Sequence, residues 1–555
     1  MLMHELVEQN ARPKASEESV IEMDSFRITC DQDGVKPYYW PIRREEIVDA
    51  GSLIIQTITR VLGKGVLSGD KYAEGLVAVS VHFLREALSV FQANLLSERC
   101  RKDHKRLGLP ASNHLWRSVF EGKEPQQSGF LQSLANGVYR PPFFKRALRP
   151  LRAFQERDGF TRRSIEFIDF DHDIVCVTNC PLTTAHVEQE SARVVLCPLN
   201  EWFYPPATHE CVTLFNKNVA LELALQLLEE LNMGFAERGG KLPPYLVSYL
   251  VNWLSEAYAW IDFYRERLRR NSDRLPKTLW AGSSGIIWSR LLAHAVRCKG
   301  GTVVSHDHVL GASYSEISPV PFTEFQSCDV FVTFSKAQAD LYEQNCRKYL
   351  ITGHMPQLHY LTDSLKEFAG KRMQKPALRS TKIQSKRILY VTPYFPTDIV
   401  GPAPLMPSIV AVDWQARLFC KLKEQGILIY QKPHPQCPTN PPEVFGTQFG
   451  VEELSGLFEN VYDCADVLVF DWPLTTTFGF ALQTDMPIVF IDFGFNRLPD
   501  EDQLLFERRC AVIRGWYDSE NRAQIRFDKL SEAIDASFMK KDMAFVQKVM
   551  GTRSC

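Results

Sequence analysis

The sequence predicts an α/β protein with two parallel-sheet units behind a largely helical N-terminal region. Short apolar runs of strand length alternate with longer helical patterns from about residue 161 to the C-terminus, and this alternation builds parallel sheets. The charged segment SLKEFAGKRMQKPALRSTKIQSK at 364–386 interrupts the alternation. We therefore expect a first unit at 161–363, a linker at 364–386 and a second unit at 387–555.

The composition is that of an ordinary globular protein and excludes several function classes. Of 555 residues, 45% are hydrophobic and 23% are charged, which rules out bulk disorder and fibrous repeats. The net charge of −2 argues against nucleic acid as the main partner, because phosphate binding favours a basic surface. The 14 cysteines are scattered without a repeated spacing, so we expect reduced thiols and no metal site.

The N-terminal region is expected to be mainly helical over residues 1–160. Between about 45 and 105, apolar residues recur at intervals of three and four, as on one face of a helix. The N-terminus lacks the apolar core of a signal peptide, and the most apolar long stretch, 246–264, contains Asn252, Glu256 and Asp262. We expect a cytoplasmic protein, with peripheral contact at the inner face of the cytoplasmic membrane left open.

Each sheet unit shows its own series of strands and helices. In the first unit, strand-like runs lie between 165 and 200, and a helical insertion is expected at about 217–270. Further strands are expected at the start of LWAGSSG, at GTVV (301–304), and at 329–335 and 348–354. In the second unit, RILYV, GILIY, DVLVF and PIVFID predict strands. Helices are expected there at 408–425, 451–460 and 529–550.

Polar residues follow the predicted strand GILIY of the second unit. Lys432 offers a mobile positive charge, and His434 can donate to a phosphate or stack on a base. Pro435 and its neighbour Pro433 fix the shape of the loop. Ligands of open parallel sheets bind at the carboxyl ends of strands, so this loop is a candidate nucleotide site. A rigid turn without a ligand is the equally plausible interpretation.

Three consecutive hydroxyl residues follow the strand DVLVF. Thr475, Thr476 and Thr477 come after Asp471 and open a helical pattern. Backbone amides at a helix N-terminus, together with hydroxyl donors, favour phosphate binding. The alternative is an ordinary threonine N-cap.

The first unit offers a candidate general base after the strand GTVV. His306, Asp307 and His308 stand there, and an imidazole or carboxylate at a strand end can deprotonate a substrate hydroxyl. Two histidines flanking a carboxylate could also bind a metal, but that site would need further ligands. A loop held by its own hydrogen bonds is the alternative interpretation.

The segment LWAGSSGIIWSRLLAHAVRCKGGTVV of the same unit predicts a strand, a glycine-rich turn, a helix and a second strand. Gly282, Ser283 and Ser284 are expected to face the space between the two units. The alternating carboxylates of 169–173 would share one face of a strand and could hold Mg²⁺ or Mn²⁺. We favour a solvated strand edge for them.

The segment ADVLVFDWPLTTTFGFALQTDMPIVFID (465–492) resembles the GT-B bacterial surface-polysaccharide transferases. That superfamily includes capsule Kdo transferases, GT-B sialyltransferases and CDP-glycerol glycerophosphotransferases. The resemblance covers a His-Pro motif, an AD-x-L-x-x-D strand, a Ser/Thr pair that opens a helix and a strand that begins x-Pro. It implies two Rossmann-like domains facing a cleft.

The resemblance also implies a function and a set of roles. It implies a metal-independent glycosyltransferase that moves an acidic sugar, Kdo-like or sialic-acid-like, from a CMP-activated donor to a surface glycan or glycolipid acceptor. His434 would contact the cytidine, and Thr475 and Thr476 its phosphate, with no cofactor beyond the nucleotide sugar. Many members carry His-Gly where this chain has His308-Val309, so the base stays open, with Asp307 and His308 favoured over His306.

Three alternatives remain on the same scaffold. A CDP-glycerol-type glycerophosphotransferase would need more positive charge for its diphosphate donor than the sequence offers near the threonines. A nucleotide-sugar epimerase would need no acceptor site. A non-catalytic scaffold would bind no nucleotide.

Overall fold

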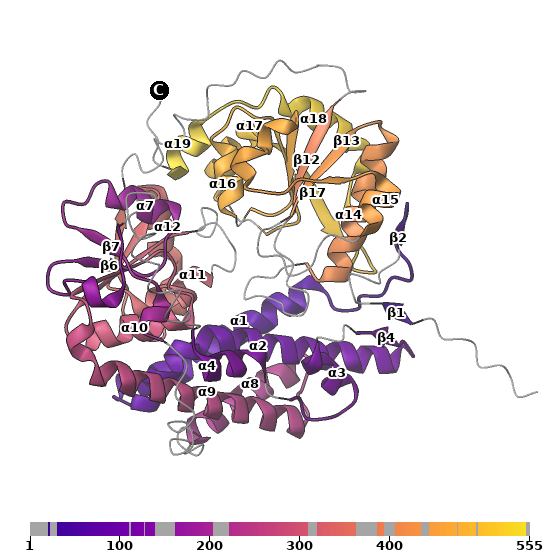
Figure 1. Cartoon of the computed structure of the whole chain (residues 1–555). Helices are drawn as coiled ribbons and strands as arrows, with labels where there is room; N and C mark the ends of the chain where they lie inside the picture. Colours follow the sequence, from indigo (N-terminus) through magenta and orange to yellow (C-terminus); the bar gives the residue numbers. More distant parts are fainter. Residues whose placement is uncertain are drawn as a thin grey trace, which may run out of the picture.

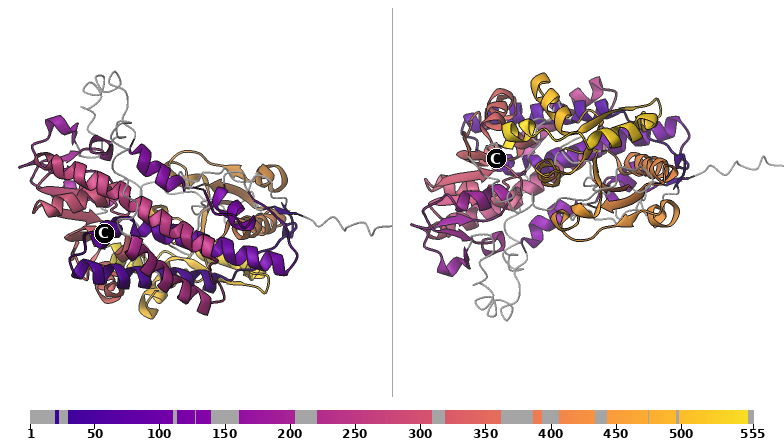
Figure 2. Two further views of the ribbon diagram at one scale, coloured as in Figure 1. Left: turned by 90° about the horizontal axis from the view of Figure 1, so that it is seen from below. Right: turned by 90° about the horizontal axis from the view of Figure 1, so that it is seen from above.

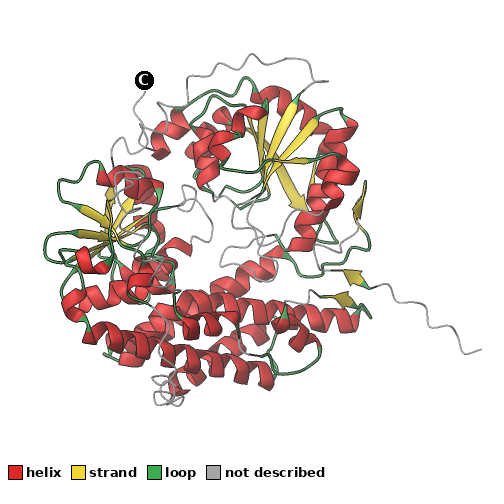
Figure 3. Ribbon diagram, viewed as in Figure 1, coloured by secondary structure: helices red, strands yellow, loops and turns green. Residues whose placement is uncertain are grey.

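The computed structural model of the chain describes residues 20–22, 30–109, 113–126, 128–138, 161–203, 221–308, 319–361, 386–392, 406–433, 443–473, 475–495 and 498–550. Two α/β units lie side by side, and a bundle of long helices runs beneath both of them (Figures 1 and 2). Each unit has a central sheet with helices on both faces (Figure 3). The expected fold class is confirmed.

The helical bundle combines two parts of the chain that are more than a hundred residues apart. Its long helices are α1 (Arg44–Leu67), α2 (Lys71–Lys102), α8 (Leu221–Glu237) and α9 (Pro244–Arg270). Helices α1 and α2 pack on each other, α8 packs on α1, and α9 packs on α2 and α8. Helix α2 is long and apolar enough to cross a membrane, but most of it is buried within the bundle. Shorter helices α3 (His114–Phe120) and α4 (Gly129–Asn136) pack against α2 and α9.

The first sheet has seven parallel strands. Their order is β11-β10-β9-β8-β6-β7-β5. The bounds are β5 (Thr161–Arg162), β6 (Ile174–Cys176), β7 (Val194–Leu196), β8 (Thr278–Ala281), β9 (Thr302–His306), β10 (Val330–Thr333) and β11 (Gln357–Tyr360). The helices of this unit are α7 (Pro181–Val187), α10 (Ile287–Cys298), α11 (Pro319–Thr323) and α12 (Lys336–Asn345).

The second sheet also has seven strands, in the order β14-β13-β12-β15-β16-β17-β18, and only β18 is antiparallel. The bounds are β12 (Arg387–Val391), β13 (Leu428–Lys432), β14 (Glu452–Glu453), β15 (Val467–Phe470), β16 (Ile488–Asp492), β17 (Ala511–Tyr517) and β18 (Ala523–Ile525). Its helices are α14 (Ser408–Glu424), α15 (Glu443–Phe449), α16 (Thr476–Leu482), α17 (Asp500–Arg509), α18 (Leu530–Ser537) and α19 (Ala544–Met550).

Several local expectations were wrong. Residues 165–167 form a 3₁₀ helix instead of a strand, and the helix expected at 529–550 is two helices, α18 and α19. The run at 348–354 contains no strand, and the last strand of the first sheet is β11 instead. Leu350 and Ile351 are buried there, but Gly353 takes a positive φ of 67° and the chain turns. Residues 451–460 form no α-helix: β14 extends the second sheet at its edge, and a single helical turn follows.

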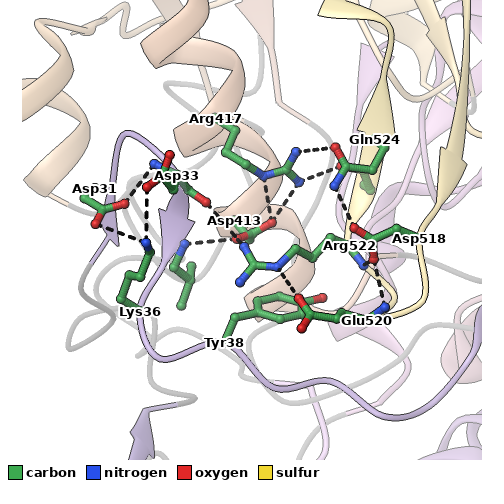
Figure 4. A network of polar contacts seen from close by, with 12 residues as sticks. Asp31, Asp33, Lys36, Tyr38, Asp413, Arg417, Asp518, Glu520, Arg522 and Gln524 are labelled. Carbon is green, nitrogen blue, oxygen red and sulfur yellow. Dashed lines mark hydrogen bonds and ion pairs between the residues drawn. The ribbon is translucent and has the colours of Figure 1, made fainter.

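The N-terminal segment before α1 packs on the second unit through the carboxylate of Asp413. A short hairpin of β2 (Cys30–Asp31) and β3 (Gly34–Val35) lies against α14. The Val35 amide donates to Asp413 Oδ1 over 3.0 Å, Arg522 Nη1 donates to the same oxygen, and Arg417 Nη2 donates to Oδ2 over 2.8 Å (Figure 4). The Arg522 guanidinium also covers the Tyr38 ring. This network joins the β2–β3 hairpin to α14 and to the turn between β17 and β18.

We predict that Asp413→Asn destabilises the second unit by about 3–5 kcal/mol, because it leaves two buried guanidinium groups without a full charge partner. Asp413 is fully buried, and the side chains of Arg417 and Arg522 are only 10% and 16% exposed. Chemical unfolding measures the change. The control is Asp528→Asn, which breaks an exposed ion pair with Arg526 and should have a far smaller effect, because solvent screens that pair. Equal effects of the two substitutions would contradict the prediction.

Candidate functional site

Each sheet has a switch point, where successive strands begin to be added on the opposite side, and ligands of open α/β sheets bind outside the carboxyl ends of the strands at such positions. In the first sheet this switch point lies between β6 and β8, and in the second between β12 and β15. The second sheet has the 3-2-1-4-5-6 order of the Rossmann fold, with β18 added at its edge. The predicted glycine-rich turn follows β8, and the three threonines follow β15.

The glycine-rich turn of the first unit is built around a buried carboxylate from another segment. Glu324 is 2% exposed and follows α11. Its oxygens accept hydrogen bonds from Ser283 Oγ (3.2 Å), the Gly285 amide (3.0 Å) and the Ser284 amide. Gly282 packs so tightly on the β6–α7 loop that a Cβ would lie 2.8 Å from the backbone of residues 179 and 180. The turn therefore holds the Glu324 carboxylate in place. The amides of the turn already have hydrogen-bond acceptors.

Glu324 lies beside His308, the most accessible of the three candidate bases. His308 Nδ1 is 4.0 Å from Glu324 Oε1, and 37% of the His308 side chain is exposed. Asp307 is only 1% exposed and accepts a hydrogen bond of 2.8 Å from the Tyr342 hydroxyl. Burial and the adjacent Asp307 hold the pKa of Tyr342 well above its usual value. His308 thus lies beside a carboxylate and is accessible to solvent, whereas Asp307 is buried within the protein.

His306 is fully buried, and both of its ring nitrogens have partners. Nδ1 lies 3.1 Å from the Ala281 carbonyl oxygen, and Nε2 lies 2.9 Å from Nδ1 of His186. The His186 ring stacks on Trp280, with centroids 4.2 Å apart. Burial, with a further contribution from His186, lowers the pKa of His306 to about 3. His306 is therefore a neutral core residue at neutral pH.

The threonines of the second unit begin α16, as expected. The Thr475 hydroxyl accepts a hydrogen bond of 3.0 Å from the Phe478 amide and so caps the helix. A hydroxyl that accepts in this way keeps its own proton for a ligand. Thr476 is exposed and Thr477 half-buried. Thr475 can therefore cap the helix and donate a hydrogen bond to a ligand at the same time.

A buried carboxylate supports the loop that carries these threonines. Asp471 is 3% exposed and follows β15 directly. Its Oδ2 accepts hydrogen bonds from the Tyr390 hydroxyl and from Trp414 Nε1 (2.9 Å), while Oδ1 has no hydrogen-bond partner among the described residues. Burial raises the pKa of Asp471 to about 6, and the two hydrogen bonds oppose this shift. Tyr390 lies on β12, so these bonds tie the two strands at the switch point together.

Lys432 ends β13 and is 6% exposed. Its ammonium donates to the Pro433 carbonyl oxygen over 2.9 Å, and burial lowers its pKa. Lys432 is therefore engaged with its own loop. His434 and Pro435 lie outside the described residues.

A second cation reaches the same edge of this sheet from the helical bundle. Arg44, the first residue of α1, donates to the Gly494 carbonyl oxygen over 2.8 Å and lies over the Phe495 ring. Phe495 packs on Trp472, which is three residues before the threonines. The Arg44 Nε is buried without a hydrogen-bond partner among the described residues. No sequence pattern predicts this contact, because Arg44 is distant in the chain and resembles any arginine at the start of a helix.

The carboxylates of 169–173 form a turn before β6, which corrects the expected alternation along a strand. Asp173 pairs with Arg193, and Asp169 contacts His172. The described parts of the chain contain no group of three or more His, Cys, Asp or Glu side chains placed to hold a metal ion.

No family model matches the chain, and no curated protein matches it. Among solved structures, one match is S. aureus MnaA in a co-structure with UDP. That chain is 13% identical to this one, the match covers 68% of this chain and 92% of the other, and the TM-score is 0.36. A likeness this weak assigns no function.

We predict that His306 makes the protein less stable at acid pH. The folded pKa lies below the ordinary value, so only the unfolded chain takes up this proton as the pH falls from about 6.5 towards 3. At pH 5 the loss is about 2 kcal/mol relative to pH 7. Denaturant unfolding measures the free energy of unfolding at both pH values. The difference between pH 5 and pH 7 should be smaller in His306→Gln than in the wild type by about that amount. An unchanged difference in stability between pH 5 and pH 7 in His306→Gln would refute the prediction.

Proposed function

We propose that the chain is a glycosyltransferase that takes an acidic sugar from a CMP-activated donor and transfers it to a hydroxyl of a glycan or glycolipid. One observation carries the proposal: the threonine run that resembles the phosphate-binding pair of GT-B transferases follows β15, at the switch point of a Rossmann-ordered sheet. The donor would bind in the second unit and the acceptor against the first. The proposal requires no cofactor and no metal, and it places the protein in the cytoplasm.

The donor leaves as CMP, so negative charge grows on its phosphate in the transition state. The hydroxyls of Thr475 and Thr476 would donate to that phosphate, and preorganised donors of this kind are an effective source of catalysis. Among the described residues, Arg44 and Lys432 lie at this edge of the sheet, and each already donates to a backbone carbonyl. The charge of these two described cations is thus partly used, which supports a monophosphate leaving group over a diphosphate.

His308 would act as the general base on the acceptor hydroxyl. A neutral imidazole accepts the proton, and the adjacent Glu324 carboxylate stabilises the resulting imidazolium. Glu324 is itself held by the glycine-rich turn, so its position does not depend on substrate. A base of this kind contributes on the order of 10²–10⁴-fold to the rate.

We predict that Thr475→Val/Thr476→Val weakens CMP binding by about tenfold or more, because the phosphate loses two hydroxyl donors. Isothermal titration calorimetry measures the affinity. Thr475→Ser/Thr476→Ser keeps both hydroxyls and is the matched control, with near-normal affinity. An unchanged affinity in the valine variant would remove the threonines from the donor site.

The same calorimetry tests the choice of nucleotide. The proposal expects metal-independent binding of CMP in preference to CDP, UDP and GDP. Preference for CDP would favour the glycerophosphotransferase, and preference for UDP an epimerase or hexosyltransferase. Binding of no nucleotide would favour a scaffold.

We predict that His308→Gln lowers kcat by about 10²–10⁴-fold while CMP affinity stays normal. CMP release from CMP-Kdo and from CMP-sialic acid, with glycan acceptors present, measures turnover. The comparison variant is Asp307→Asn, whose amide oxygen still accepts the Tyr342 hydrogen bond and which should retain most activity. Normal turnover in His308→Gln, or a larger loss in Asp307→Asn, would move the base away from His308.

A further inference from the structure

A cavity behind α10 contains a buried arginine that is only partly hydrogen-bonded. The cavity lies where α10 meets α2 and α9 of the helical bundle and has a volume of about 40 Å³. One ordered water needs about 10–15 Å³ on this scale, so three or four oxygen-sized groups fit. Its charged and imidazole side chains are Glu74, Arg265, Arg290, His294 and Arg297.

Arg290 is the central group of this lining. Its side chain is 2% exposed, and Nη1 donates to the Ala78 carbonyl oxygen and to Ser80 Oγ, both over 3.3 Å. Its Nε and Nη2 have no hydrogen-bond partner among the described residues. Burial lowers the pKa of Arg290 to about 10, and the charge of Glu324 partly opposes this. A buried guanidinium with two unused donor nitrogens is costly unless an acceptor is supplied.

The neighbouring cations reinforce the positive potential. Arg290, His294 and Arg297 lie at positions i, i+4 and i+7, on one face of α10. Arg297 pairs with Asp329 over 2.9 Å, whereas Arg265, on α9, pairs more loosely, 3.6 Å from Glu74. Burial, followed by the nearby Arg265 and Arg297 guanidinium groups, lowers the pKa of His294 to about 4. The acceptor that fits this cavity is therefore an anion.

We propose that this cavity binds a phosphate-type oxyanion, with Arg290 as its buried donor and Arg265 and Arg297 at its rim. The planar guanidinium fork matches the oxygens of a tetrahedral oxyanion. A wider open groove of about 470 Å³ shares His294 and Arg297 with the cavity. The oxyanion is accordingly either free phosphate or the phosphate of a small ester whose organic part lies in the groove.

This site is separate from the candidate donor and base sites. The groove is also lined by Thr302, where β9 begins, and by Asp329, just before β10. These are the amino ends of the strands, whereas His308 and the threonines follow carboxyl ends. A bound anion would join the bundle to the first unit, because α2 and α9 contribute one wall of the cavity and α10 the other.

The test is thermal unfolding of the full chain in potassium phosphate and in potassium chloride of equal ionic strength. At 100-fold excess over Kd, phosphate should raise Tm by about 3 °C. Arg290→Met should abolish this rise and, without phosphate, unfold no earlier than the wild type. Arg526→Met, at an exposed arginine, is the matched control and should keep the rise.

Arg290→Lys is a second variant for the case that the methionine variant does not fold. It keeps the charge but loses the fork, and equilibrium dialysis with radiolabelled phosphate should show about tenfold weaker binding. Tighter binding of glycerol 3-phosphate than of phosphate would identify an ester as the ligand, and equal binding the free anion. The proposal is overturned by the lack of a phosphate-specific shift in the wild type, by a shift retained in Arg290→Met, or by loss of the shift in Thr475→Val/Thr476→Val.

Discussion

The buried carboxylate of Asp413 holds the β2–β3 hairpin against the β17–β18 end of the second sheet. It accepts hydrogen bonds from Arg417 on its own helix, from Arg522 in the β17–β18 turn and from the Val35 amide. Gly34 makes this approach possible: its φ of +101° is left-handed, and a side chain there would collide with the carboxylate. Because α1 starts nine residues after Val35, the same contact fixes where the bundle meets the second unit, and so brings Arg44 to the edge where the threonines lie.

Much of the fold follows from periodicity, because most of the described parallel strands are short runs of five residues or fewer, with the seven-residue β17 as an exception. RILYV, GILIY and PIVFID became β12, β13 and β16, close to their expected positions. The predictions failed where buried residues do not form regular secondary structure. Leu350 and Ile351 are buried in a turn, and hydropathy alone does not distinguish a buried turn from a strand.

Part of the candidate site could be predicted from the sequence for the same reason. The turn of Ser283 and the threonine run follow recognisable strands, so parallel topology determined their place. The carboxylate of Glu324 could not be found in this way. It follows a short helix without a motif, and only tertiary packing brings it to the amides of a turn about 40 residues earlier.

Burial distinguishes between the three adjacent candidates that the sequence left open. Successive residues at a strand end face different surroundings, so His306 lies in the core, Asp307 under Tyr342, and His308 at the surface beside Glu324. The Glu324 charge also acts on Arg290, a buried residue of α10. An anion bound at Arg290 would offset the attraction of that guanidinium for Glu324. The same carboxylate thus lies 4.0 Å from His308 Nδ1 and partly opposes the lowering of the Arg290 pKa.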